Sequence, residues 1–273
     1  MGLNTANSKK VSESKYNVLR IFNNNRINLI TYLKYSDLDS SLIKQYKSAI
    51  TEAFPEIILR SRVTEEYWSR LENYFPHTQV FMVDSNNDLL GFMNAIPIFW
   101  DQMLEDLPQE GWDWLLRKGI SDFEDNVLPN ILGGLQIIVT KKYQGQGYSK
   151  LLISKGKEIR KSLGLDKLII PIRPILKHNH PQLLMKDYID LKKNNKVYDP
   201  WIRTHLESGA TLIKVCENSM NVRGNISFWE ELLGEKITES GSYKIDGALN
   251  LVTVDLEENY GEYREENIWI YYD

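Results

Sequence analysis

Cysteine is almost absent from this chain, because Cys216 is the single one among its 273 residues. One cysteine excludes an internal disulfide and suits a reducing compartment, so we expect a cytoplasmic protein in which Cys216 is a small buried side chain. No apolar run reaches the roughly 18 residues that span a bilayer. Residues 1–17 are polar and lack the apolar core of a secretory signal. We therefore expect no membrane partner.

A basic surplus is also lacking, since the net charge is -4 and the pI is about 5.7. A general nucleic-acid binder concentrates lysine and arginine, so we expect no nucleic-acid partner. With 42% hydrophobic and 26% charged residues, the composition is that of a globular protein large enough to bury a core. We expect a loose tail at residues 1–15 and one domain over residues 16–273.

The hydrophobic pattern alternates between strand-like and helix-like periodicity. It predicts helices at 37–54, 64–75, 148–164 and 201–207, and strands at 26–33, 80–83, 89–98, 131–140, 165–176, 210–218, 247–256 and 267–273. The strand–helix–strand order over 131–176 implies a parallel crossover. We expect a mixed α/β fold with the strand at 131–140 near its centre, because this strand is apolar on both faces near its end.

Two segments differ from this pattern. Residues 101–130 are acidic and aromatic and are long for a connection, which is typical of a lid or binding loop, although a solvated acidic insert is also compatible. The C-terminal extension at about 216–273 is rich in tyrosine and strand-forming residues. We expect it to complete the sheet and to wall off a substrate pocket.

The segment VTKKYQGQGYSKLL places Gly145 and Gly147 where a strand ends and a helix begins. The first turn of a helix leaves backbone N–H groups unpaired and carries a positive dipole, so this turn can hold a pyrophosphate. A P-loop requires Gly-Lys-Ser/Thr, which the chain lacks. The dinucleotide fingerprint requires a third glycine where Lys150 stands. Neither of these phosphate loops fits.

The spacing of Gln144, Gly147 and Ser149 resembles the acyl-CoA loop of the GNAT N-acetyltransferase superfamily, with Ser149 in place of the usual glycine or alanine. The resemblance covers the element order from Arg26 to Val215 and the motif at 136–152. It implies a GNAT-like sheet flanked by helices and splayed after Val139, and an acyltransferase that uses acetyl-CoA or another acyl-CoA as cosubstrate. It assigns cofactor binding to Ile137, Ile138, Val139, Gln144, Gly145, Gln146, Gly147, Tyr148, Ser149 and Lys150.

The resemblance also implies that a small-molecule or peptide amine attacks the thioester directly, through a tetrahedral intermediate. Many GNAT proteins place a tyrosine four residues before a Gly–aromatic pair in their last helix, to serve the leaving thiolate. Here the matching glycine is Gly209, and His205 stands in place of the tyrosine. His205 is therefore the candidate catalytic acid or base, although a buried structural histidine fits the same position.

Arg173 lies at the end of the strand after the loop helix, on the edge that lines the substrate side in GNAT proteins. Its guanidinium suits a carboxylate or phosphate, although a surface arginine between two prolines is also compatible. His178 and His180 have an H-x-H spacing but no third ligand at a recognisable distance, so we predict no metal site.

Two other functions stay open at this level. Because the usual tyrosine is missing, the chain can be a module that binds an acyl-CoA without catalysing a reaction. The extended C-terminal region instead suits a protein that handles acyl groups on a carrier protein, or that decarboxylates them, in a biosynthetic pathway.

Overall fold

The computed structural model describes residues 18–23 and 26–273, with side chains from residue 29 onward. The predicted tail at residues 1–15 lies outside the described residues. No helix within the described part of the chain is long and apolar enough to cross a membrane.

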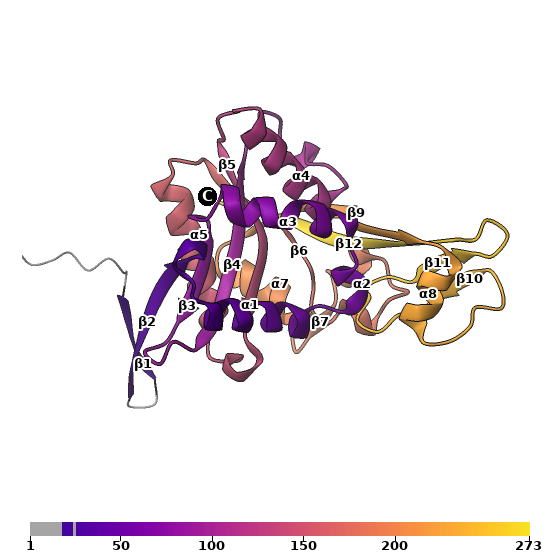
Figure 1. Cartoon of the computed structure of the whole chain (residues 1–273), viewed down its shortest axis with the longest axis horizontal. Coiled ribbons are helices and arrows are strands. Elements are labelled where there is room, and N and C mark those ends of the chain that lie inside the picture. The colour runs from indigo at the N-terminus through magenta and orange to yellow at the C-terminus, as the bar shows by residue number, and fades with distance from the viewer. Residues whose placement is uncertain (1–17, 24–25) are drawn as a thin grey trace, which may run out of the picture.

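A mixed sheet of ten strands in the described residues runs through the molecule (Figure 1). Its order is β1-β2-β3-β4-β5-β6-β12-β11-β10, and β9 pairs with β12. β5 and β6 are parallel, and the other neighbours are antiparallel. The strands are β1 (Val18–Asn23), β2 (Arg26–Lys34), β3 (Gln79–Val83), β4 (Leu89–Ile98), β5 (Ile131–Val139), β6 (Lys167–Ile172), β9 (Thr211–Gly224), β10 (Gly241–Tyr243), β11 (Val252–Asp255) and β12 (Tyr260–Tyr272). The predicted mixed α/β fold with β5 near the centre is confirmed.

Helices cover both faces of this sheet (Figure 1). One face packs against α1 (Ser40–Ala53), α2 (Glu56–Leu59), α3 (Arg62–Tyr74), α4 (Gly111–Glu124) and α8 (Ile226–Leu233). The opposite face packs against α5 (Tyr148–Ser162), α6 (Met185–Tyr188) and α7 (Pro200–Glu207). A separate short hairpin joins β7 (Lys192–Lys193) and β8 (Lys196–Val197).

Side-chain caps explain where several helices begin. The carboxylate of Asp39 accepts the N–H of Leu42 at 2.8 Å before α1, and the Ser61 hydroxyl accepts the N–H of Thr64 before α3. Because Ser61 is the cap, α3 begins at Arg62 rather than at the predicted residue 64. Asp199 caps α7, whose first residue is a proline, a residue suited to a helix start.

The segment at residues 101–130 differs from the expectation of a lid or solvated insert. It forms α4, which buries Trp112, Leu115, Leu116 and Ile120 against β4, β5 and β9. The physical reason is the spacing of these apolar side chains, which places them on one helical face. The segment is therefore part of the core, and the acidic residues lie mainly outside the buried stripe.

Candidate functional site

The two parallel strands at the centre of the sheet separate partway along their length. β5 and β6 pair only from Ile131 to Gly133, although β5 continues to Val139. The splay therefore begins at Gly134, and the predicted opening after Val139 was wrong in position by several residues. A β-bulge explains the earlier opening, because Gly134 and Gln136 face Ala95 and Asn94 on β4 and leave Leu135 as an extra residue.

Polar side chains hold this bulge in place. The Gln136 amide donates to Asn94 at 2.8 Å, and the Asn94 amide donates to Gln79 at 2.8 Å. On the other side, the indole N–H of Trp112 donates to the Leu135 carbonyl at 2.7 Å. Since a bulge leaves backbone groups unpaired within the ladder, these bonds stabilise the separation of the strands.

The glycine loop between β5 and α5 is built to expose backbone N–H groups. Gly145 and Gly147 have φ values of +76° and +83°, in the left-handed region that favours glycine. A Cβ at either position would meet nothing within 4 Å, so the space above the loop is open. Among the described residues, no acceptor binds the N–H groups of residues 145–149. Free backbone N–H groups at a helix N-terminus are the kind of arrangement that can hold an anion.

Other loop side chains have different roles. The Gln144 amide donates to the Val139 carbonyl at 3.2 Å and ties the loop to the end of β5. Tyr148 is buried in the core, so only its backbone remains available to a ligand at the loop. The Lys150 ammonium pairs with Glu207 on α7 at 3.0 Å, with both side chains about half exposed. An exposed pair of this kind is weak, so Lys150 can exchange its partner for a phosphate.

A cavity of about 570 Å³ passes through the splay from one face of the sheet to the other. On the α5 and α7 face it is lined by residues 136–139 of β5 and by Gln144, Ser149, Trp201 and His205. On the opposite face it reaches α1, α2, α3, α4 and β9. Arg173 lines it from the end of β6. Most of the residues predicted from the sequence, including Ile137, Ile138 and Val139, therefore meet at one cavity.

His205 borders this cavity from α7, yet its side chain is fully buried. Its Nδ1 lies 2.7 Å from the Tyr272 hydroxyl, and Trp201 packs against the ring. Its Nε2 has no hydrogen-bond partner among the described residues. Burial, and then the nearby Lys157 ammonium, lower the pKa of His205 to about 3. The imidazole is thus neutral at pH 7, and its buried Nε2 is left without a hydrogen-bond partner among the described residues.

The pKa of His205 predicts how stability depends on pH. The ordinary pKa of histidine is 6.5, and the pKa of His205 in the folded chain is about 3. As the pH falls through this range, the unfolded chain takes up a proton at His205 and the folded chain does not. Within this window the free energy of unfolding falls by about 1.4 kcal/mol per pH unit. We expect the unmodified chain to lose about 2 kcal/mol more than His205→Gln between pH 7 and pH 5, measured by denaturant unfolding. Equal losses would contradict a buried neutral histidine.

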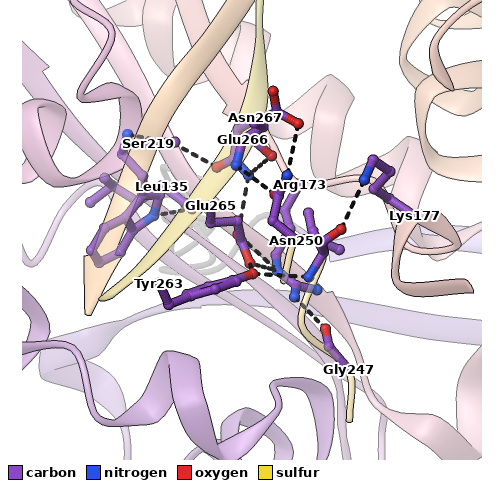
Figure 2. Close-up of polar contacts among 12 residues, drawn as sticks. Leu135, Arg173, Lys177, Ser219, Gly247, Asn250, Tyr263, Glu265, Glu266 and Asn267 are labelled. Carbon is purple, nitrogen blue, oxygen red and sulfur yellow. Dashed lines mark hydrogen bonds and ion pairs between the residues drawn. The ribbon is translucent and has the colours of Figure 1, made fainter. Parts of the chain in front are cut away.

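Arg173 is held by a buried polar network rather than exposed on the surface (Figure 2). Its Nε donates to both carboxylate oxygens of Glu265 at 3.0 Å, and its Nη2 donates to the Gly247 carbonyl at 2.7 Å. Glu265 is 0% exposed and also accepts from Tyr263 and Asn267. These contacts use two of the three guanidinium nitrogens, Nε and Nη2, and Arg173 also lines the cavity.

The H-x-H segment lies away from this cavity. Lys177, next to His178, is buried and donates to the carbonyls of His180 and Leu249. The His180 ring packs against Tyr188 and Tyr198. Within the described residues, no group of three or more histidine, cysteine or acidic side chains is placed to hold a metal ion.

Sequence reasoning missed three residues of this site. Trp68 and Trp112 line the cavity from α3 and α4, and Glu265 fixes Arg173 from β12. An aromatic residue in a long insert was visible in the sequence, but its contact with the β5 bulge joins residues far apart in the chain. The carboxylate partner of Arg173 lies 92 positions later, with no motif to connect the two.

Comparisons with known proteins are consistent with this geometry. No protein-family model matches the chain. The chain is similar to the arginine N-acetyltransferase avaD of Aspergillus versicolor, with 25% identity over 249 residues, covering 81% of this chain and 85% of that protein. The loading GNATL domain of CurA from Lyngbya majuscula superposes with a TM-score of 0.57 at 15% identity, covering 89% of this chain and 96% of that one. The GphF GNAT-like decarboxylase, solved with isobutyryl-CoA, gives a TM-score of 0.54 at 12% identity, with 89% and 97% covered.

Proposed function

We propose that this chain, a member of the GNAT superfamily and an acyl-CoA-dependent N-acyltransferase, joins an acetyl group to an amine by direct attack on the thioester. The family, the fold and the acyl-CoA cosubstrate expected from the sequence are confirmed. The observation that supports the finer proposal is the cavity through the splay, which joins the nest of N–H groups to the opposite face of the sheet. We also propose that residues 16–273 form a single domain, since one sheet connects most of the described elements.

The loop fits the pyrophosphate of an acyl-CoA. The N–H groups of residues 145–149 are free, and the space in front of Gly145 and Gly147 is open. A dianionic phosphate pair gains both hydrogen bonds and the helix dipole at this place. We propose that the pantetheine arm then lies along the free edge of β5 at Ile137, Ile138 and Val139, where β6 has turned away.

The acceptor amine must lose a proton to become a nucleophile. Among the described residues that line the cavity, the titratable side chains are Glu52, Arg173 and His205. The low pKa of His205 makes its imidazole a weak base. The apolar cavity itself favours the neutral amine, because burial disfavours the ammonium form. We propose that desolvation supplies the nucleophile and that the proton leaves through the exposed side near Glu52.

His205 is the candidate that serves the leaving sulfur. In the tautomer in which Nδ1 accepts from the Tyr272 hydroxyl, the neutral imidazole carries its proton on Nε2, and Nε2 has no hydrogen-bond partner in the described residues. We propose that this N–H donates a hydrogen bond to the departing thiolate. The role differs from proton donation by an imidazolium, because the low pKa leaves His205 uncharged at pH 7.

Arg173 is the candidate for binding a negatively charged group of the acceptor. It lines the cavity, and Glu265 fixes its guanidinium in place. An acceptor with a carboxylate, such as an amino acid or a peptide, gains a charge-assisted hydrogen bond there. The curated relative acts on arginine, as its name states, which is an amine of this kind.

Release of coenzyme A from acetyl-CoA with a panel of amines tests the proposed reaction. We expect Gly147→Val to weaken acetyl-CoA binding at least tenfold by calorimetry, because the branched side chain crowds the phosphate nest. Gly164→Val is the matched control, since Gly164 has a φ of +68° and open space at the other end of α5. It imposes similar backbone strain without touching the loop. Equal affinity in both variants would place the phosphates elsewhere.

The two alternatives remain distinguishable. A module that only binds an acyl-CoA would show affinity for acetyl-CoA and no release of coenzyme A with any amine. A protein that loads or decarboxylates acyl groups would change the mass of a carrier protein after incubation with acetyl-CoA or malonyl-CoA. Release of coenzyme A that depends on a free amine, without a mass change on a carrier, supports N-acylation over both.

A further inference from the structure

The half of the cavity on the side of α1 to α4 is strongly apolar. It is lined by Ile50, Ala53, Phe54, Ile58, Leu59, Trp68, Trp112 and Met220, with Glu52 and Thr64 as the polar residues from α1 and α3. Glu52 is exposed, so its carboxylate keeps contact with water. A second positive charge on the acceptor would therefore lose its hydration in this half of the cavity. Among the described residues that line this half, Glu52 has the one carboxylate that could pair with it.

Two stacked indoles, those of Trp68 and Trp112, line this half of the cavity and are called the indole wall below. The rings of Trp68 and Trp112 are stacked, with their centroids 6.0 Å apart and an interplanar angle of 11°. The Trp68 N–H donates to the Tyr46 hydroxyl and to Glu72, both at 3.1 Å, and the Trp112 N–H donates to the Leu135 carbonyl. Because both N–H groups are already bonded within the protein, what the pair offers to a ligand is aromatic surface.

The wall is also fixed relative to the splay. Leu135 is the bulged residue at which β5 leaves β6, and Trp112 is bonded to its carbonyl at 2.7 Å. Trp68 is in turn held by Tyr46 on α1 and Glu72 on its own helix. A ligand that packs on these indoles is thereby placed at a set position beside the opening through the sheet. Such preorganisation lowers the cost of binding and orients the reacting group.

We infer that the acceptor carries a flat apolar body, such as an arylalkyl amine or an aromatic amino acid, which packs on Trp68 and Trp112 while its nitrogen points to the splay. This inference rests on the proposed N-acylation. A small amine such as ethylamine leaves the indole wall uncovered. A guanidinium can stack on an indole, but it must be desolvated among apolar side chains with Glu52 at the exposed end.

Steady-state acetylation of three amines tests the inference, with acetyl-CoA held constant. We expect phenethylamine to show a kcat/KM at least tenfold above the values for ethylamine and argininamide, because burial of the ring adds apolar contact in the transition state. Trp68→Ala should raise the KM for phenethylamine about tenfold and leave the KM for acetyl-CoA unchanged. The matched control is Trp114→Ala, whose half-buried ring packs on Trp100 and Trp269 and does not line the cavity.

The outcomes separate this inference from the proposed reaction. If ethylamine or argininamide is acetylated as well as phenethylamine, the reaction stands and the aromatic acceptor is wrong. A different result would be that the protein prefers hexanoyl-CoA to acetyl-CoA as donor, and that Trp68→Ala removes this preference without changing the discrimination between amines. The indole wall would then hold the acyl chain, and the inference would be overturned. If no amine is acetylated, calorimetry with phenethylamine and coenzyme A decides. If phenethylamine binds and Trp68→Ala weakens this binding, the indole wall holds an aromatic ligand even though the proposed reaction fails. If phenethylamine does not bind, the inference is refuted.

Discussion

Replacement of His205 by alanine is expected to lower kcat and kcat/KM together by roughly 100-fold, while the Kd of acetyl-CoA barely moves. The reason is the loss of the Nε2–H that is proposed to donate to the leaving thiolate, because Nε2 has no other hydrogen-bond partner among the described residues. The hydrogen bond forms as charge develops on sulfur, so its loss appears in the chemical step rather than in binding. Stopped-flow or steady-state release of coenzyme A, with calorimetry on the same preparations, measures both quantities.

The controls separate catalysis from folding. His205 is 0% exposed and contacts Trp201 and Tyr272, so the alanine variant also leaves a cavity that lowers stability. Rates are therefore taken per folded molecule at a temperature well below the melting midpoint. Tyr272→Phe removes the hydroxyl at Nδ1, so the proton of the neutral imidazole is no longer directed to Nε2. We expect a smaller loss of kcat in this variant, by about tenfold. Unchanged turnover per folded molecule in His205→Ala would make this histidine structural.

Replacement of Glu265 by alanine is expected to lower the free energy of unfolding by about 3–5 kcal/mol. Glu265 is fully buried and accepts hydrogen bonds from Arg173, Tyr263 and Asn267. Removing the carboxylate leaves the Arg173 guanidinium, itself mostly buried, without its ion pair and leaves two donors unsatisfied. Equilibrium unfolding in urea measures the change in the free energy of unfolding. The slope of this free energy against urea concentration should be the same in both proteins, so that the comparison reports stability alone.

An exposed carboxylate is the matched control for Glu265. Glu231 pairs with Arg60 at 2.7 Å, with the two side chains 64% and 38% exposed. We expect Glu231→Ala to lower the free energy of unfolding far less than Glu265→Ala does, because solvent screens an exposed ion pair. Comparable losses in the two variants would show that the network around Arg173 contributes little. Since Glu265 also orients Arg173, its alanine variant should raise the KM for an acceptor that bears a carboxylate.

Local signals account for what the sequence predicted well. The longer strands and the helices α1, α3, α5 and α7 follow from hydrophobic periodicity, which reports which face of a segment is buried without reference to its partner. The turn at Gln144–Ser149 was located from its two glycines, and Gly145 and Gly147 do adopt positive φ values, whereas anion binding by this turn stays a prediction.

The same reasoning was less successful where a residue depends on a distant partner. The sequence located His205 through the spacing to Gly209, and the structure places it beside the cavity. Its protonation, however, follows from burial among Trp201, Tyr272 and Lys157, which come from three separate elements. A histidine on the solvent-exposed face of the same helix would keep an ordinary pKa, because its imidazole would not be desolvated.

By itself, the sequence determined the longer strands, four of the helices and the position of the glycine turn between β5 and α5, because each depends on neighbours within about one helix or strand. The tertiary structure alone decided where the sheet opens, what holds Arg173 and which side chains face the acceptor. The splay begins at Gly134 because Leu135 bulges against β4 and bonds to Trp112. Trp68 and Trp112 meet as a stacked pair because α3 and α4 pack together over one face of the sheet. Such contacts depend on packing between segments that are distant in the sequence, so local hydrophobic periodicity does not predict them.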